Sequence, residues 1–150
     1  MVLTQKESTL LKDLKDQEML CIEKYERYSA QASSGELKNL FTQMAQTERA
    51  HYRTITKMMD GTESEAPASL SGNNANAQAV NYDSTQQKNN DKFMCQDMLA
   101  TEKHASALYN TCVFEFTTPE ARKMLNHIQS EEQQHGEQLA TFMKNNNMYN

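Results

Sequence analysis

Apolar residues recur along the chain at steps of three and four, the spacing that places side chains on one face of an α-helix. Between residues 10 and 60 the pattern follows two such stripes, and after residue 85 it follows two more. It predicts four helices of roughly 25 to 30 residues each. Their expected bounds are about 4–32, 35–59, 85–116 and 119–144.

Residues that favour helix ends stand at these bounds. The serines at 33–34 offer an N-cap hydroxyl to the second helix. Thr118 offers the same to the fourth helix, where Pro119 fits the first position because its missing N–H would have no partner there. Gly61 follows the second helix and is expected as its left-handed C-cap.

The two halves of the chain resemble each other. When residues 4–59 are aligned with 88–143, an offset of 84 positions, seven residues are identical. Four of these identities are polar or phenolic residues within the apolar stripes: Glu18 and Glu102, Tyr25 and Tyr109, Glu48 and Glu132, His51 and His135. An internal repeat of this size predicts two helical hairpins of one construction, related by a pseudo-twofold axis.

The segment between the two hairpins has a composition of its own, with six asparagines between residues 61 and 90. We expect an irregular connection there. Hairpins related by a pseudo-twofold axis need parallel second and third helices, so this connection has to run the length of the bundle. The prediction is an all-α, four-helix bundle with one long crossover, the ferritin-like arrangement. Its expected parts are one domain over 1–150, repeat A at about 4–60, a crossover loop at about 61–84, repeat B at about 85–144 and a tail at 145–150.

Composition and charge exclude several classes of protein. The 15 basic and 20 acidic residues give a formal net charge of -5, so we expect neither a nucleic acid nor an anionic membrane as partner. Four glycines and two prolines are too few for a β-sandwich or barrel. The chain contains no apolar run of the roughly 18 residues that cross a bilayer and no recognisable signal peptide. Cys21, Cys95 and Cys112 are expected as reduced thiols of a protein made in the cytoplasm.

The glutamates and histidines of the repeat indicate a metal site. His51 and His135 each follow a glutamate by three positions, so both side chains of each pair point the same way. Four ionised carboxylates in one core would repel each other, whereas two divalent cations would balance their charge. One Glu from each of two helices and Glu-x-x-His from the other two is the ligand set of di-iron and di-manganese bundles. The predicted ligands are Glu18, Glu48, His51, Glu102, Glu132 and His135.

Within this set we expect Glu18 and Glu102 as terminal ligands, and Glu48 and Glu132 as bridging ones. Mixed oxygen and nitrogen ligands suit Fe first and Mn next, while Zn would bind the same set. Such a centre could oxidise a substrate with O2 or remove peroxide, so an oxidoreductase activity stays open. A metal-free network of buried hydrogen bonds is the alternative.

Tyr25 and Tyr109 lie seven residues after Glu18 and Glu102, on the same helix face. We expect their hydroxyls to donate hydrogen bonds to ligand carboxylates, with plain core packing as the alternative.

The other histidines, Cys21 and Gly136 are expected to have ordinary structural roles. His104 and His127 are expected at the surface, with His127 placed for an i, i+4 pair with Glu131. Cys21 lies one turn from Glu18 and is expected as a buried, unreactive thiol. Gly136 stands opposite Tyr52 in the repeat, where it either opens one side of the site or allows close helix packing.

The second half of the chain resembles the coat F family of bacterial spore coat proteins. The resemblance is carried by DKFMCQDMLATEKHASALYN, with its QDxLxTEK stretch and later YN, and by SEEQQHGEQLATFMKNNNMYN, with its E-E-x-x-H helix and short tail. It covers residues 85–150 well, and 4–60 more weakly through the repeat. The tail departs from the family pattern, because Asn147-Met148-Tyr149 stands where a Gly-Trp-Tyr type of ending is usual.

This resemblance implies a ferritin-like domain made in the cytoplasm of a spore-forming bacterium and deposited in the spore coat beside other coat proteins. A homodimer is a further association that the sequence leaves open. The ligand set is also similar to that of rubrerythrins, bacterioferritins and manganese catalases. Unlike rubrerythrins, the chain has no CxxC pair, and Leu99 and Ala105 leave no extra glutamate one turn from Glu102. Two hypotheses follow: a metal-binding coat protein with oxidase or peroxide-removing activity, and a metal-free structural coat component with a vestigial site.

Overall fold

The computed structural model describes residues 2–61 and 79–149, and within them it contains four α-helices and no strand. The helices are α1 (Gln5–Gln31), α2 (Gly35–Met59), α3 (Thr85–Glu115) and α4 (Pro119–Asn145). Each bound lies within one residue of the position expected from the apolar pattern. The prediction of an all-α, four-helix bundle is confirmed.

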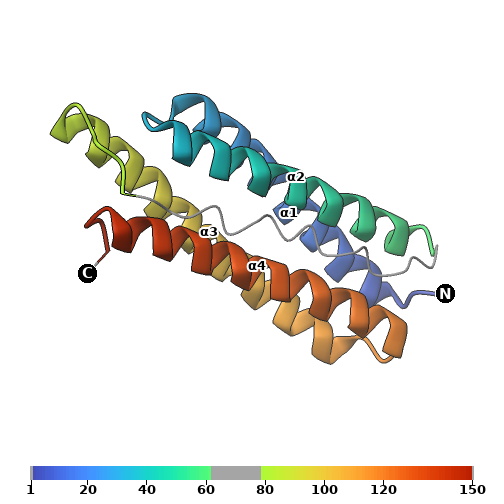
Figure 1. The fold of residues 1–150 in the computed structure, drawn as a ribbon. Helices are drawn as coiled ribbons and strands as arrows, with labels where there is room; N and C mark the ends of the chain where they lie inside the picture. The colour runs from blue at the N-terminus through green and yellow to red at the C-terminus, as the bar shows by residue number, and fades with distance from the viewer. Residues whose placement is uncertain (1, 62–78, 150) are drawn as a thin grey trace.

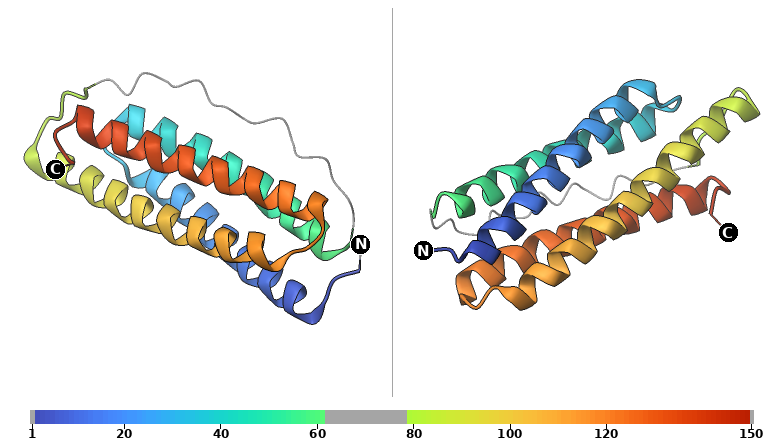
Figure 2. Two further views of the ribbon diagram at one scale, coloured as in Figure 1. Left: turned by 90° about the horizontal axis from the view of Figure 1, so that it is seen from below. Right: turned by 180° about the vertical axis from the view of Figure 1, so that it is seen from behind.

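The helices pack as two antiparallel hairpins, α1 with α2 and α3 with α4, which meet mainly through α1 and α3 (Figure 1). The C-terminal end of α2 and the N-terminal end of α3 lie at opposite ends of the bundle, so these helices run in the same direction (Figure 2). This is the relation that the predicted crossover needs. Most of the expected crossover at 61–84, residues 62–78, lies outside the described residues.

The helix ends follow the sequence signals with one exception. The Ser34 hydroxyl accepts a hydrogen bond from the backbone N–H of Leu37, and Gly61 has a φ of 75°, as expected of a left-handed C-cap. The expected hydroxyl cap of α4 was wrong, because the Thr118 side chain makes no capping hydrogen bond. Pro119 follows it and removes one of the N–H groups that a cap would serve, while the Thr118 carbonyl still accepts from Arg122.

The buried apolar side chains form two clusters, one toward each end of the bundle. One cluster contains Tyr25, Phe41, Met44, Met98 and Leu139, among others, and the second contains Leu14, Ile55, Tyr109, Leu125 and Ile128, among others. On every helix the glutamates and histidines of the predicted site come between residues of the first cluster and residues of the second. The core is therefore apolar at both ends and polar in the middle.

One buried aspartate connects the two hairpins near the α1–α2 turn. Asp91 of α3 accepts hydrogen bonds from the backbone N–H groups of Ser33 (2.7 Å) and Ser34 (3.1 Å) and from the Tyr82 hydroxyl (2.8 Å). The carboxylate is fully buried, and both of its oxygens have partners. It also lies at the N-terminus of α2, where a negative charge is stabilised.

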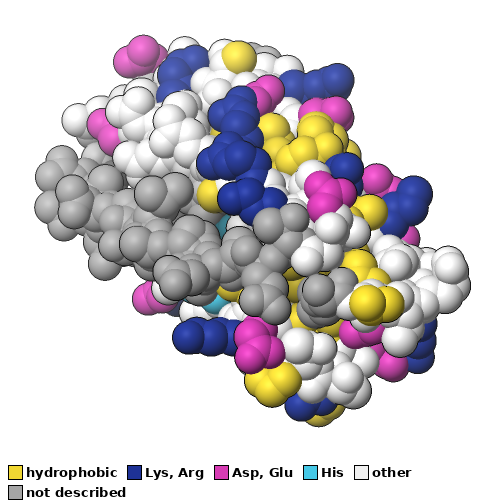
Figure 3. All heavy atoms as spheres, turned by 90° about the vertical axis from the view of Figure 1, so that its right-hand side faces the viewer, with side chains coloured by type: hydrophobic (Ala, Val, Ile, Leu, Met, Phe, Trp, Pro, Cys, Tyr) yellow, Lys and Arg dark blue, Asp and Glu magenta, His cyan; other side chains and the backbone are white. Residues whose placement is uncertain are grey.

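Among the described residues on the side of the molecule seen in Figure 3, the right-hand end of Figure 1, charged side chains of both signs lie side by side with apolar side chains between them. This mixture of signs matches the modest net charge of -5. Among the described residues no helix combines the length and the apolar character needed to span a membrane.

Candidate metal centre

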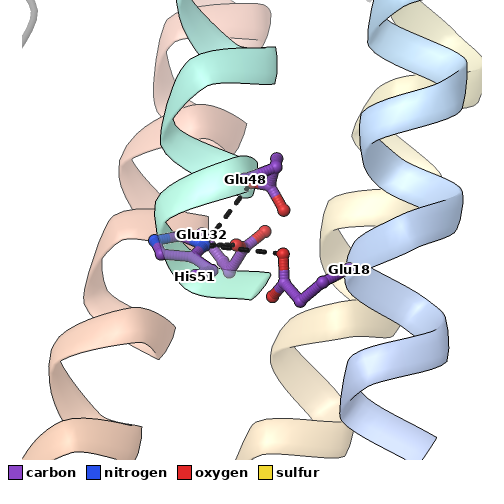
Figure 4. Close-up of side chains that lie close together, drawn as sticks. All are labelled: Glu18, Glu48, His51 and Glu132. Carbon is purple, nitrogen blue, oxygen red and sulfur yellow. Dashed lines mark ion pairs between the residues drawn. The ribbon is translucent and has the colours of Figure 1, made fainter. Parts of the chain in front are cut away.

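All six predicted ligands meet in the polar middle of the core. Glu18 comes from α1, Glu48 and His51 from α2, Glu102 from α3, and Glu132 and His135 from α4. None of these residues is more than 5% exposed. Figure 4 shows four of them, from three helices, pointing toward one another. The spacing of three residues between glutamate and histidine turns both side chains of α2, and both of α4, to the bundle axis.

The six residues form two overlapping groups of possible ligands. The first group contains Glu18, Glu48, His51 and Glu132, and the second contains Glu48, Glu102, Glu132 and His135. Within each group one oxygen or nitrogen per residue lies within 4.8 Å of all the others. Glu48 and Glu132 belong to both groups, so each could contact two ions, whereas Glu18 and Glu102 each belong to one.

Each imidazole turns its Nδ1 atom toward these carboxylates. Nδ1 of His51 lies 2.7 Å from Oε1 of Glu132 and 3.6 Å from Oε2 of Glu18. Nδ1 of His135 lies 3.0 Å from Oε1 of Glu48 and 3.2 Å from Oε1 of Glu102. The nearest carboxylate to each histidine therefore belongs to the opposite hairpin, which makes the site a product of both hairpins.

Most of the carboxylate oxygens of this cluster, and Nδ1 of His51, make no hydrogen bond of normal geometry within the described part of the chain. They are Oε2 of Glu18, both oxygens of Glu48, Nδ1 of His51, Oε2 of Glu102 and both oxygens of Glu132. Buried polar atoms of folded proteins almost always have partners, as those of Asp91 do. Seven such atoms around one space fit a pair of cations, which would take these oxygens and nitrogens as ligands.

The electrostatics of the cluster divide the four glutamates into two pairs. Burial, together with the charges of neighbouring glutamates, raises the pKa of Glu48 and that of Glu132 well above the ordinary value. Burial acts in the same direction on Glu18 and Glu102. In these two, contact with a neighbouring glutamate, histidine and tyrosine outweighs burial, and the pKa lies below its ordinary value.

The histidines respond to the same carboxylates. Burial alone would lower the pKa of His51 and of His135, but the surrounding glutamates raise both. Without a cation, protons on Glu48, Glu132 and the two imidazoles therefore offset the charge of the cluster. A divalent cation would take the place of these protons.

Two tyrosines hold the outer glutamates from across the bundle. The Tyr25 hydroxyl of α1 donates to Oε1 of Glu102 on α3, and the Tyr109 hydroxyl of α3 donates to Oε1 of Glu18 on α1, both at 2.5 Å. Each bond leaves Oε2 of the same glutamate without a hydrogen bond of normal geometry. The two contacts are reciprocal, since each hairpin supplies one donor and one acceptor.

The structure adds Glu131 to the surroundings of the candidate site, whereas the sequence analysis expected it only as a partner of His127. Glu131 forms the expected i, i+4 pair with His127, whose Nε2 lies 3.1 Å away, but Glu131 is itself only 5% exposed. Its Oε1 also lies 3.0 Å from Nε2 of His51 on the other hairpin. The only sequence signal for this role is that Glu131 directly precedes the predicted ligand Glu132, whereas Thr47 precedes Glu48 in repeat A.

The other histidines and the cysteines lie largely where the sequence analysis expected them. His104 is exposed, and His127 is partly buried, with a side chain 20% exposed. All three cysteines are free and buried, and burial raises the pKa of Cys21, as do the neighbouring glutamates. A Cβ on Gly136 would lie 3.7 Å from Leu99, an ordinary contact, so close helix packing does not require glycine there.

Comparison with known proteins connects the second hairpin to one family. Residues 90–150 match the family model of the Coat F domain, a span that includes most of α3, all of α4 and the tail. Three of the six candidate ligands, Glu102, Glu132 and His135, lie within the match. The searches of curated proteins and of solved structures found no match.

Proposed function

We propose that this chain is a spore coat protein whose ferritin-like bundle binds a dinuclear iron or manganese centre. The observation that carries the proposal is the cluster of seven buried oxygen and nitrogen atoms that make no hydrogen bond of normal geometry. Two divalent cations would supply the partners of these atoms and balance four carboxylates. Zinc fits the same donor atoms, so the identity of the metal is decided by measurement.

In this proposal the two outer glutamates, Glu18 and Glu102, would each hold one ion. Glu48 and Glu132 would serve both ions, which agrees with their membership of both groups. His51 and His135 would each offer a nitrogen, Nδ1, to the centre. Tyr25 and Tyr109 keep the outer carboxylates in place through their hydrogen bonds.

A bound iron or manganese pair would supply electrons to O2 or peroxide by changing oxidation state. The residues of the chain would provide binding and shelter for that chemistry. The apolar clusters on both sides of the site exclude water from its two ends. The two tyrosine hydroxyls are the nearest proton donors to the outer ligands.

The location in the spore coat rests on the Coat F match of residues 90–150. We propose that the protein is made in the cytoplasm and becomes part of the coat together with other coat proteins. Large exposed apolar side chains such as Phe93 and Phe114 on α3 are available for such contacts. Self-association to a homodimer would use the same kind of surface.

Metal analysis of protein expressed with both iron and manganese, and purified without chelator, tests the centre. We expect about two metal ions per chain, as in other dinuclear carboxylate bundles. The double variant Glu48→Ala with Glu132→Ala should bind no metal and should lose the increase in melting temperature that metal gives the wild type. Glu23→Ala with Glu137→Ala, both exposed, is the matched control and should keep wild-type metal content.

Absence of metal in the wild type, even after anaerobic addition of Fe(II), would contradict the centre. Unchanged metal content in the double variant would contradict the ligand assignment. The first result would favour the other hypothesis, a metal-free structural coat component in which the six residues are a vestige. In that case apolar replacement of all six should stabilise the fold, because it removes buried charges that have no counter-ion.

A further inference from the structure

The two halves of the candidate centre differ in what supports their histidines. Nε2 of His51 lies 3.0 Å from Oε1 of Glu131, while its Nδ1 faces the space between the glutamates. With Glu131 ionised, the ring nitrogen of His51 that faces it carries the proton, because a carboxylate only accepts hydrogen bonds. This contact turns Nδ1 of His51 to the centre as the nitrogen available to a cation.

No carboxylate in residues 2–61 or 79–149 makes the corresponding contact with Nε2 of His135. The position that corresponds to Glu131 in repeat A is Thr47, whose hydroxyl donates to the backbone carbonyl of Gln43. His135 instead packs edge-on against the Tyr25 ring, at 6.1 Å between centroids. The two histidines thus match in sequence but differ in what orients them.

Glu131 is itself held in place. It is buried to 5% exposure, and on its other side Nε2 of His127 lies 3.1 Å from the same Oε1 atom. A carboxylate between two imidazoles, one of them near the surface, has little freedom to turn away from His51. Histidine ligands whose second nitrogen donates to a carboxylate bind metals more tightly, and loss of that partner weakens affinity about 10- to 100-fold.

Building on the proposed dinuclear centre, we infer that its two metal positions are unequal and that Glu131 is the positioning residue responsible. The position formed by Glu18 and His51 binds the first ion, and the position formed by Glu102 and His135 binds the second. The bridging glutamates serve both positions and do not distinguish between them.

Zinc titration of metal-free protein labelled with 15N-histidine tests this inference, because Zn²⁺ is diamagnetic and leaves the ring signals visible. The signals are assigned with single His→Gln variants. In the wild type we expect the first equivalent to shift Nδ1 of His51, and the second to shift Nδ1 of His135. Glu131→Thr, which gives repeat B the residue of repeat A, should weaken the first binding step about 10- to 100-fold and remove the order.

Two further variants separate positioning from a general effect on the fold. Glu131→Gln keeps a carbonyl oxygen that accepts from Nε2 of His51, so it should retain the order of binding. Thr47→Val removes the hydroxyl at the corresponding position of α2 and should bind zinc as the wild type does. Circular dichroism of each variant checks that the helices are intact, and the order in the wild type tests the inference independently of any variant.

The possible results separate the two proposals. Binding of two zinc ions with both histidines shifting together in the wild type would overturn the inequality and leave the dinuclear centre standing. Retention of the order in a folded Glu131→Thr protein would overturn the role of Glu131. Failure of the wild type to bind any zinc would overturn both the inference and the centre on which it rests.

Discussion

At the scale of single residues, the reciprocal tyrosine contacts define how the outer glutamates face the centre. Tyr109 donates to one oxygen of Glu18 and Tyr25 donates to one oxygen of Glu102, while the second oxygen of each carboxylate makes no hydrogen bond of normal geometry. The donors fix which oxygen is free and in which direction it points. They therefore reduce the reorganisation that metal binding would require.

Tyr109→Phe removes one of these hydrogen bonds while keeping the buried ring. We expect Mn²⁺ affinity to fall about 10-fold, because the Glu18 carboxylate loses its orienting donor. The measurement is a Mn²⁺ titration followed by calorimetry. Tyr28→Phe is the control, since that hydroxyl donates to Asp97 rather than to a glutamate of the centre. An equal loss of affinity in both variants would argue against a specific role for Tyr109.

Cys21 provides a second prediction at this scale. It is fully buried, and burial together with the nearby glutamates raises the pKa of its thiol, so the reactive thiolate is scarce in the folded protein. We expect iodoacetamide to modify Cys21 only after unfolding, as peptide mass spectrometry would show. Labelling of Cys21 in native protein, at the rate of an unfolded control, would show that the core opens far more readily than its packing indicates.

At the scale of elements, the junction between α3 and the α1–α2 turn depends on Asp91. Asp91→Ala would leave two backbone N–H groups and the Tyr82 hydroxyl without their acceptor. We expect a loss of about 2 to 4 kcal/mol in the free energy of unfolding, measured by urea denaturation. Asp83→Ala, at an exposed position just before α3, is the control and should change stability by less than about 0.5 kcal/mol.

The helices themselves could be predicted because their signals are local. Apolar periodicity, Ser34 and Gly61 fixed the bounds of α2 from residues within a turn of each end. The Thr118 cap was wrong for a reason that the pattern does not reveal. A hydroxyl before a helix is available for capping, but whether it bonds depends on its rotamer and on the N–H groups that remain, and Pro119 removes one of them.

The candidate site was predictable to the extent that it repeats. The four glutamates and two histidines recur at one offset within apolar stripes, and the structure brings all six together. Glu131 was missed as part of the site because it occurs in only one repeat and lies beside the stripe rather than in it. Its contact with His51 joins two hairpins, and a side-chain contact of that kind depends on how they pack.

At the scale of the whole molecule, the protonation of the cluster connects stability to pH. In the metal-free protein Glu48, Glu132, His51 and His135 all have a raised pKa. Above about pH 6 the folded chain therefore holds protons that the unfolded chain has released, and stability falls as pH rises. The lowered pKa of Glu18 and of Glu102 acts in the opposite direction, but only as pH falls below the ordinary value of 4.5.

We therefore expect opposite trends with and without metal. The melting temperature of protein in chelator should fall between about pH 6 and 8, whereas in excess Mn²⁺ it should rise or stay level, because binding displaces protons and strengthens with pH. Thermal melts in both conditions at matched ionic strength are the measurement. Parallel trends in chelator and in Mn²⁺ would contradict the exchange of protons for metal at this cluster.

The origin of the ligands from all four helices also has a consequence for the lifetime of the protein. In metal-loaded protein no helix could leave the bundle without removing at least one candidate ligand, so unfolding would have to pass through loss of metal. Its rate would then follow metal dissociation rather than the packing of any one helix. For the proposed location in a spore coat, such kinetic persistence is a property that a retained metal centre would contribute even without turnover.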